Sequence, residues 1–277
     1  MKTRIIVDST ADLPASLVGN VDVVPLTVHF GEEEFVDGVT IDHKTFYEKL
    51  VESDALPSTS QATPARFAEV FEKLEGDAVV ITLASELSGT YQSAVIAAED
   101  YEGRVFVVDS RTAAIGAGIL AKYAMELAES DMSAQQIAQE LTVQRDKVRV
   151  VALLDTLEYL KRGGRISKTV ALAGTLLSIK PVVAIQEGKI QMLGKARGSR
   201  QGNNLLVQEI EKAGGVDFDK PLLLGYTGLS NALLEKYIQD SRALWEPAGS
   251  LETTIIGSVI GTHAGPGAVA VAFFSKQ

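Results

Sequence analysis

The order of β-rich and helical segments in the first half of the chain constrains the fold more than any other feature. Residues 78–83 form a continuous apolar run, which is typical of a strand buried on both faces. Alternation of strands and helices predicts right-handed βαβ units and a mostly parallel, Rossmann-like sheet. The expected strands cover residues 4–7, 21–24, 78–83, 105–108 and 148–154, and the expected helices 45–52, 65–75, 88–99, 113–129 and 133–145.

The second half of the chain follows a different pattern. Two β-rich runs flank Gln186-Glu187-Gly188-Lys189, which predicts a hairpin with glycine in its turn. A hairpin mixed with helices indicates an α+β domain with a mixed sheet. Because strand character stops before Gly163-Gly164, we expect domains at residues 1–160 and 161–277, with the ligand between them. The expected strands here are 181–185, 190–193, 222–226, 253–259 and 268–274, and the helices 203–213 and 232–241.

Composition and charge exclude several classes of function. The 277 residues carry a formal net charge of −10, which disfavours nucleic acid and anionic membrane surfaces as partners. The chain has no cysteine, so disulfides, thiolate catalysis and thiolate metal sites are excluded. No apolar run is long enough to span a bilayer, and the N-terminus lacks the apolar core of a signal peptide. We therefore expect a cytoplasmic protein.

Four loops rich in hydroxyl groups follow or precede the expected strands and helices. They cover residues 8–14, 57–64, 85–94 and 109–111. Serine, threonine and aspartate are the usual helix caps and turn residues, so each loop alone fits a structural role. Three of the loops share one edge of the expected parallel sheet, where ligands of such folds commonly bind.

The third loop carries the clearest signal for a ligand. Ser88 is a suitable helix N-cap, and Gly89 lets the backbone approach a ligand closely. Thr90 and Ser93 are three residues apart, so both hydroxyls lie on one face of the first helical turn. A helix N-terminus with neutral hydroxyls suits a single carboxylate or phosphate. The loops lack lysine and the nucleotide motifs GxxxxGK[ST] and GxGxxG, so we expect no nucleotide cofactor.

The histidines offer a catalytic alternative. His29 and His43 lack the spacing of metal ligands, and we expect no metal. His263 lies in a segment with three glycines and a proline between two β-rich runs, where a turn-bonded histidine is an equally good interpretation. Ser93 and His263 could form a nucleophile and base, although no G-x-S-x-G elbow is present. An acyl ester or acyl-phosphate hydrolase therefore stays the alternative function, and no catalytic residue is assigned.

Two basic islands and one apolar segment complete the candidates. The islands, residues 161–165 and 195–200, are either solvated loops or docking sites for an anionic partner or phosphorylated head group. The apolar segment, residues 170–179, is either a core helix or one wall of an apolar tunnel.

These segments together resemble the DegV family of bacterial fatty-acid-binding proteins over the length of the chain. Each segment alone is weak, but their number and order make the resemblance specific. The matching segments are DSTADLP (Asp8–Pro14), PSTSQ (Pro57–Gln61), LSGTYQSA (Leu87–Ala94), VVDSR (Val107–Arg111), LDTLEYLKRGGRIS (Leu154–Ser167), LLSIKPVV (Leu176–Val183) and HAGPGAVAVAFF (His263–Phe274).

The resemblance implies a lipid-binding carrier rather than an enzyme. A long-chain fatty acid is expected between two α/β domains as a bound ligand, with no cofactor. The residues expected around its carboxylate are Thr59, Ser60, Gly89, Thr90, Ser93 and His263.

The resemblance also implies a partner. In bacteria with a fatty-acid kinase, such a protein presents its acyl chain to the kinase, which makes an acyl-phosphate for phospholipid synthesis. The family's GKxR segment matches Lys195–Arg197. Lys195, Arg197 and Arg165 are accordingly expected to contact the phosphate or the partner, and the protein itself is expected to be a monomer.

Overall fold

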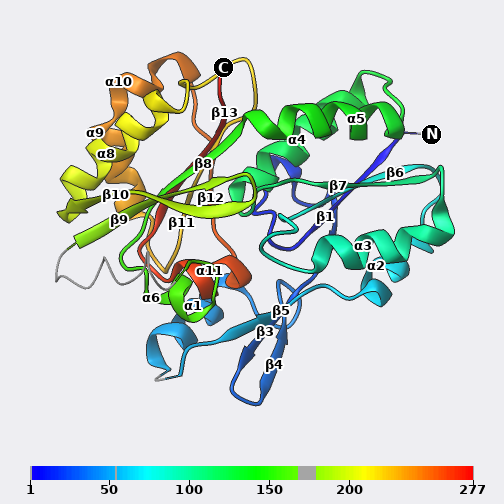
Figure 1. Cartoon of the computed structure of the whole chain (residues 1–277), viewed down its shortest axis with the longest axis horizontal. Coiled ribbons are helices and arrows are strands. Elements are labelled where there is room, and N and C mark those ends of the chain that lie inside the picture. The colour runs from blue at the N-terminus through cyan, green and yellow to red at the C-terminus, as the bar shows by residue number, and fades with distance from the viewer. Residues whose placement is uncertain (1, 54, 168–178, 277) are drawn as a thin grey trace.

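The chain is described by a computed structural model that covers residues 2–53, 55–167 and 179–276 (Figure 1). Its strands belong to three sheets: four parallel strands in the order β2-β1-β6-β7, six mixed strands in the order β10-β9-β8-β13-β11-β12, and three antiparallel strands in the order β4-β3-β5. The strands are β1 (Arg4–Asp8), β2 (Asp22–Val24), β3 (Thr27–Phe30), β4 (Glu33–Val36), β5 (Ser58–Ser60), β6 (Ala78–Thr82), β7 (Val105–Asp109), β8 (Val148–Leu153), β9 (Ile179–Gln186), β10 (Lys189–Arg197), β11 (Leu223–Tyr226), β12 (Thr253–Ile255) and β13 (Val269–Phe274).

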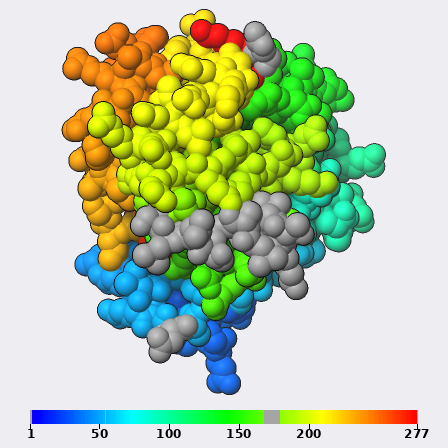
Figure 2. Space-filling view, turned by 60° about the vertical axis from the view of Figure 1, so that its left-hand side comes forward, coloured from blue at the N-terminus to red at the C-terminus, as the bar shows by residue number. Residues whose placement is uncertain are grey.

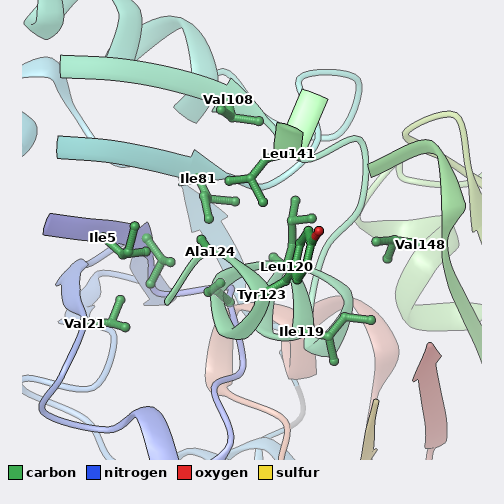
Figure 3. Packing of buried hydrophobic residues seen from close by; sticks show 14 of the residues in the cluster. Ile5, Val21, Ile81, Val108, Ile119, Leu120, Tyr123, Ala124, Leu141 and Val148 are labelled. Atoms are coloured by element: carbon green, nitrogen blue, oxygen red, sulfur yellow. The ribbon is translucent and has the colours of Figure 1, made fainter. Parts of the chain in front are cut away.

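Helices cover both faces of the parallel sheet, which confirms the expected α/β class. Every residue of β6 is buried, as its continuous apolar sequence predicts. On one face, Ile5 and Ile81 pack with Leu120 of a long helix (Figure 3). On the other face, Ile6 and Val80 pack with Phe67. The covering helices are α4 (Ile115–Glu129) and α5 (Ala134–Gln144) on the first face, and α2 (Pro64–Phe71) and α3 (Thr90–Ala98) on the second.

The six-stranded sheet confirms the expected mixed architecture of the second half. Strands β9 and β10 form the predicted hairpin, and its turn residues Glu187 and Gly188 have φ angles of 50° and 77°. Positive φ at both positions is the requirement of the tightest hairpin turns. Helices α8 (Gly198–Lys212), α9 (Ala232–Asp240) and α10 (Arg242–Trp245) lie along one side of the sheet (Figure 1), and α4 packs on the other.

The mixed sheet begins before the domain boundary that was expected at residues 160/161. Strand β8 lies between β9 and β13 in the six-stranded sheet, so that sheet already begins at Val148. A single hydrophobic cluster also joins Ile81 of the parallel sheet to Val150 and Phe274 of the mixed sheet, with α4 between them. The two sheets therefore share a core, and the division into two domains stays a prediction.

The expected strand at residues 253–259 is also wrong in its second half. Strand β12 ends at Ile255, and helix α11 (Ser258–Ala264) follows. The first turn of α11 is fixed by buried carboxylates, because Asp12 accepts a hydrogen bond from the Gly257 N–H at 2.6 Å and Asp37 accepts one from the Ser258 hydroxyl. The start of this helix is fixed by contacts between residues more than 200 positions apart in the sequence. A local sequence pattern does not reveal such contacts.

The small sheet β4-β3-β5 was not expected from the sequence. It lies beside helices α1 (His43–Glu52), α6 (Glu158–Arg162) and α11 below the two larger sheets (Figure 1). In Figure 2 the blue N-terminal segments lie at the bottom, and the β9–β10 hairpin and α8 lie above them. Among the described helices, none is long and apolar enough to cross a membrane.

Candidate functional site

An apolar pocket lies where the six-stranded sheet meets the parallel sheet and α11. The space between its walls is about 940 Å³ when the open solvent at its mouth is included. Alternate residues Val150, Ala152 and Leu154 of β8 and the segment after it face the pocket, because side chains alternate along a strand. Across the sheet, Ala268 and Ala270 leave space where larger side chains would fill it.

One end of this pocket carries the polar residues that line it. We call this set the polar end; it consists of Thr59, Gln61, Ser88, Arg165 and His263. Thr59 comes from the edge strand β5 and His263 from the last turn of α11. Their side chains are joined by a hydrogen bond of 2.9 Å between Thr59 Oγ1 and His263 Nε2, across 204 positions of sequence. The structure thus brings together two residues that the sequence nominated separately.

A second hydrogen bond ties the polar end to helix α3. Gln61 Nε2 donates to Ser93 Oγ at 2.9 Å. Ser93 is 2% exposed and lies behind Gln61, whose side chain lines the pocket. A Cβ atom on Gly89 would lie 2.1 Å from Gln61 Oε1, so only glycine lets the amide lie against the first turn of α3. Gly89 therefore contributes to the site by leaving room for the side chain of Gln61.

His263 is neutral at physiological pH in this setting. Burial, and then the positive charge of Arg165, lowers the pKa of His263 from 6.5 to about 4. Its ring packs on Gly163, where a Cβ would lie 2.2 Å from Nδ1. Nδ1 is buried and has no hydrogen-bond partner among the described residues. His263 can therefore orient Thr59, but it carries no charge of its own to offer an anion.

Arg165 supplies the positive charge of the polar end. Its Nε donates to the Leu87 carbonyl at 3.3 Å and its Nη1 to the Gly163 carbonyl at 2.6 Å. Within residues 2–53, 55–167 and 179–276, no carboxylate forms an ion pair with it. A guanidinium balanced only by carbonyls leaves charge available for an anion in the pocket.

The remaining nominated residues lie away from the pocket lining. Ser60 points to the other side of β5, where its hydroxyl contacts Nε2 of half-buried His29 at 2.8 Å, because successive strand residues face opposite ways. The buried Thr90 hydroxyl is 3.0 Å from Ser88 Oγ. Lys195 and Arg197 are exposed on the edge strand β10. The apolar wall expected at residues 170–179 lies, except for Ile179, outside the described residues.

Two of the four hydroxyl-rich loops have structural roles. The Asp8 carboxylate accepts hydrogen bonds from the Leu83 N–H at 2.7 Å and the Thr10 hydroxyl at 2.6 Å, which fixes the turn after β1. The Asp109 carboxylate accepts one from the Ser85 hydroxyl at 2.6 Å in the same way. These are the cap and turn roles that such residues usually have. Of the four loops, only the TSQ segment (Thr59–Gln61) and the residues at the start of α3 contribute to the polar end, together with Arg165 and His263 from elsewhere.

The geometry offers little for covalent catalysis. The hydroxyl of Ser93 is bonded to Gln61 and the ring of His263 to Thr59, so the suggested Ser93–His263 pair is not formed. A base with a pKa near 4, and with no acceptor on Nδ1 in the described part of the chain, would activate the Thr59 hydroxyl poorly. The described residues also contain no group of three or more histidine, aspartate or glutamate side chains that could hold a metal ion.

Sequence reasoning omitted Gln61 and Ser88 from the head-group residues, although both line the pocket. Gln61 belongs to the TSQ segment that had been singled out, so its position next to Thr59 was the available signal. The sequence predicts Ser88 as the N-cap of α3, whereas in the structure Gly89 is the cap and the helix begins at Thr90. The Ser88 hydroxyl still accepts a hydrogen bond from the Thr90 N–H at 3.3 Å. The cap position itself is left to Gly89, which can approach Gln61.

Known proteins resemble this chain along its whole length. A family model described as an uncharacterised protein of the DegV family matches residues 2–276. A DegV domain-containing protein of Caldanaerobacter subterraneus is 34% identical over 286 residues, which is 99% of each chain. A solved fatty-acid-binding DegV family protein from Thermus thermophilus is 33% identical, with a TM-score of 0.87 over 99% of this chain and 100% of that one.

A third likeness concerns the fold alone. The Streptococcus pneumoniae fatty acid kinase B3 protein, solved with linoleic acid, is 22% identical and superposes with a TM-score of 0.86 over 99% of each chain. The family match over residues 2–276 is consistent with the parallel and mixed sheets of the fold. It is also consistent with the segments that build the polar end. The chain is a member of the DegV family.

Proposed function

We propose that this protein binds one long-chain fatty acid, with the acyl chain in the apolar pocket and the carboxylate at the polar end. The observation that carries this proposal is the division of the pocket, whose apolar lining ends in hydroxyl groups beside a guanidinium that pairs with no carboxylate of the described residues. A fatty acid has the same division. The Thermus thermophilus relative, described as binding fatty acid, supports the assignment.

Hydrogen bonding prepares two hydroxyl groups as donors. Gln61 donates to Ser93 Oγ, so the hydroxyl proton of Ser93 is free to point elsewhere. His263 Nδ1 has no partner among the described residues, and a buried N–H without an acceptor is costly. The neutral ring therefore places its proton on Nε2 and donates to Thr59, whose own proton is then free. Two such hydroxyls suit a carboxylate, which only accepts hydrogen bonds.

The side chain of Gln61 acts as a movable cover in this proposal. Gln61 is exposed, whereas Ser93 behind it is 2% exposed. When the amide swings toward solvent, the carboxylate takes its place as the partner of Ser93 and bridges to Thr59. Arg165 then balances the charge, because His263 stays neutral.

The presentation of the acyl chain to a fatty-acid kinase is a further part of the proposal, and it rests on the sequence resemblance. Lys195 and Arg197 are exposed on β10, the edge strand of the six-stranded sheet. Two exposed cations on a chain of net charge −10 suit an acidic docking partner. Charge reversal of both should slow phosphorylation by an added kinase and leave fatty-acid binding unchanged.

Lipid recovery and thermal stability test the binding proposal. Denaturing mass spectrometry of protein expressed in a bacterium should release a fatty acid in a near-equimolar amount. Delipidated protein should melt at a lower temperature and recover when a long-chain acid is added, because a ligand at 100 times its Kd stabilises the native state by about 2.7 kcal/mol.

The same samples separate the carrier from the hydrolase. An activated acyl ester should leave no covalent adduct on Ser93 or Thr59. Protein that releases no lipid and melts at one temperature with and without fatty acid would refute the carrier, and an acyl adduct would favour the hydrolase.

A further inference from the structure

A second, charged hollow continues the line of the apolar pocket. Val150, Ala152 and Leu154 line the pocket from alternate positions. Val148, the next residue on that face of β8, lines the hollow instead. Because residues two apart on a strand are about 6.8 Å apart, the hollow begins one side-chain repeat beyond the pocket.

The packing clusters show which end of the pocket meets the hollow. Leu154 belongs to a cluster with Leu160, and Ala264, the neighbour of His263, packs against it. Val150 belongs to the cluster that also contains residues of the parallel sheet, and Ile185 packs against that same cluster. Leu154 therefore lies on the His263 side of the pocket, whereas Val150 and its partner Ile185 lie four positions farther back along β8.

Ile185 is the residue that separates the two spaces. It pairs with Val150 across β8 and β9, and it lines both the pocket and the hollow. On the far side the lining is mostly polar and charged: Arg111, Arg145, Asp146, Arg149, Gln186, Glu187 and Gln191, with Val148.

The charged side chains of the hollow are held in place. Arg111 Nη1 pairs with the Asp146 carboxylate at 2.9 Å, and Arg145 Nη1 donates to the Asp109 carbonyl at 2.6 Å. Arg149 Nη1 donates to the Asp146 carbonyl at 2.6 Å. A methyl group pushed past Ile185 would displace these polar contacts and their water rather than gain apolar contact.

We propose that Ile185 ends the acyl pocket and sets the length of the fatty acid that the protein prefers. This inference rests on the proposed function. Each methylene group that fits before Ile185 gains burial, and binding tightens roughly fourfold for each one. The gain stops at Ile185, because the next space is charged.

The chain offers a matched control. Ile190 lies directly opposite Ile185 in the β9–β10 hairpin and also lines the pocket. It packs against the Leu154 cluster and does not line the hollow. The same truncation at both positions removes equal volume, but only one of them removes the barrier.

The experiment measures affinity for saturated fatty acids of increasing length in wild type, Ile185→Ala and Ile190→Ala. The wild-type affinity should rise with length and then level off. In Ile185→Ala the plateau should move to acids longer by about two methylenes, each tightening binding up to fourfold. Ile190→Ala should lower affinity at every length without moving the plateau. Ile185→Val, a smaller change, should move it less and in the same direction.

The outcomes separate this inference from the proposed function. A plateau that stays in place in both Ile185 variants, or that moves equally in Ile190→Ala, would overturn the role of Ile185 while fatty-acid binding stands. Wild-type protein that binds no acid of any length would contradict the proposed function as well.

Discussion

The polar end of the pocket and its apolar body are built in opposite ways. One wall of the body consists of residues on neighbouring strands, such as Ala152 of β8 and Ala270 of β13, which face each other by sheet register. The polar end is assembled from separate segments, and Thr59 and His263 meet across 204 positions. Substitutions in the body should therefore change which acyl chain fits, whereas substitutions at the polar end should decide whether an acid binds at all.

The largest effect is expected from removing both hydroxyls of the carboxylate site. Each hydrogen bond to a charged group contributes about 1.5–3 kcal/mol. Thr59→Ala combined with Ser93→Ala should then weaken fatty-acid binding by about a hundredfold or more. Titration calorimetry on delipidated protein measures the change.

A neighbouring hydroxyl provides the control for this double variant. Ser60→Ala removes the hydroxyl next to Thr59 on β5, which faces His29 rather than the pocket. Its affinity should equal that of wild type. Equal affinity of the double variant and wild type would place the carboxylate somewhere other than Thr59 and Ser93.

The next effect concerns the glycine under the His263 ring. Gly163 has an ordinary helical backbone, so alanine is allowed there, but its Cβ would lie 2.2 Å from His263 Nδ1. Overpacking of this kind costs about 1–3 kcal/mol. Gly163→Ala should lower the free energy of unfolding by that amount and weaken fatty-acid binding, because His263 must leave Thr59.

Gly164 is the matched control for Gly163. No described residue lies within 4 Å of a Cβ there, but its φ of +71° lies in the left-handed region, where every side chain adds strain and asparagine is among the best tolerated. Gly164→Asn should leave affinity unchanged, as calorimetry can show, and any loss of stability in it comes from backbone strain rather than from contact with His263. If both variants behave alike, the close approach of Gly163 to His263 does not hold the site together.

The contrast between body and polar end also explains what the sequence could predict. The parallel sheet and the β9–β10 hairpin follow from local apolar patterns and from Glu187-Gly188, and both are confirmed. The second half of the strand expected at residues 253–259 is wrong because Asp12 and Asp37 hold the start of α11. The sequence marked the TSQ segment and the start of α3, but not that Ser60 faces away while Gln61 covers Ser93. Such orientations depend on tertiary contacts that no local pattern displays.

A smaller effect is expected in the pH dependence of stability. Burial lowers the pKa of His263 from 6.5 to about 4, so the unfolded chain takes up this proton at a higher pH than the folded one. The folded state therefore loses stability relative to the unfolded state as pH falls from about 6.5 toward 4. His263→Gln should remove this part of the acid-side loss.

Urea unfolding at pH 5 and pH 8 measures that difference. Wild type should lose more stability between the two pH values than His263→Gln does. An identical loss in wild type and His263→Gln would mean that the ring is not kept neutral by burial.

The smallest effect, and the sharpest test of the polar end, comes from Gln61. If its amide is a cover, Gln61→Ala frees Ser93 without removing a ligand contact, and affinity should stay equal or tighten a few-fold, since one competing hydrogen bond contributes only about 1 kcal/mol. If the amide itself holds the carboxylate, affinity should fall about tenfold or more. Gln92→Ala, exposed on the same helix as Ser93, is the control and should change nothing. A fall in affinity confined to Gln61→Ala would move the carboxylate from Ser93 to Gln61.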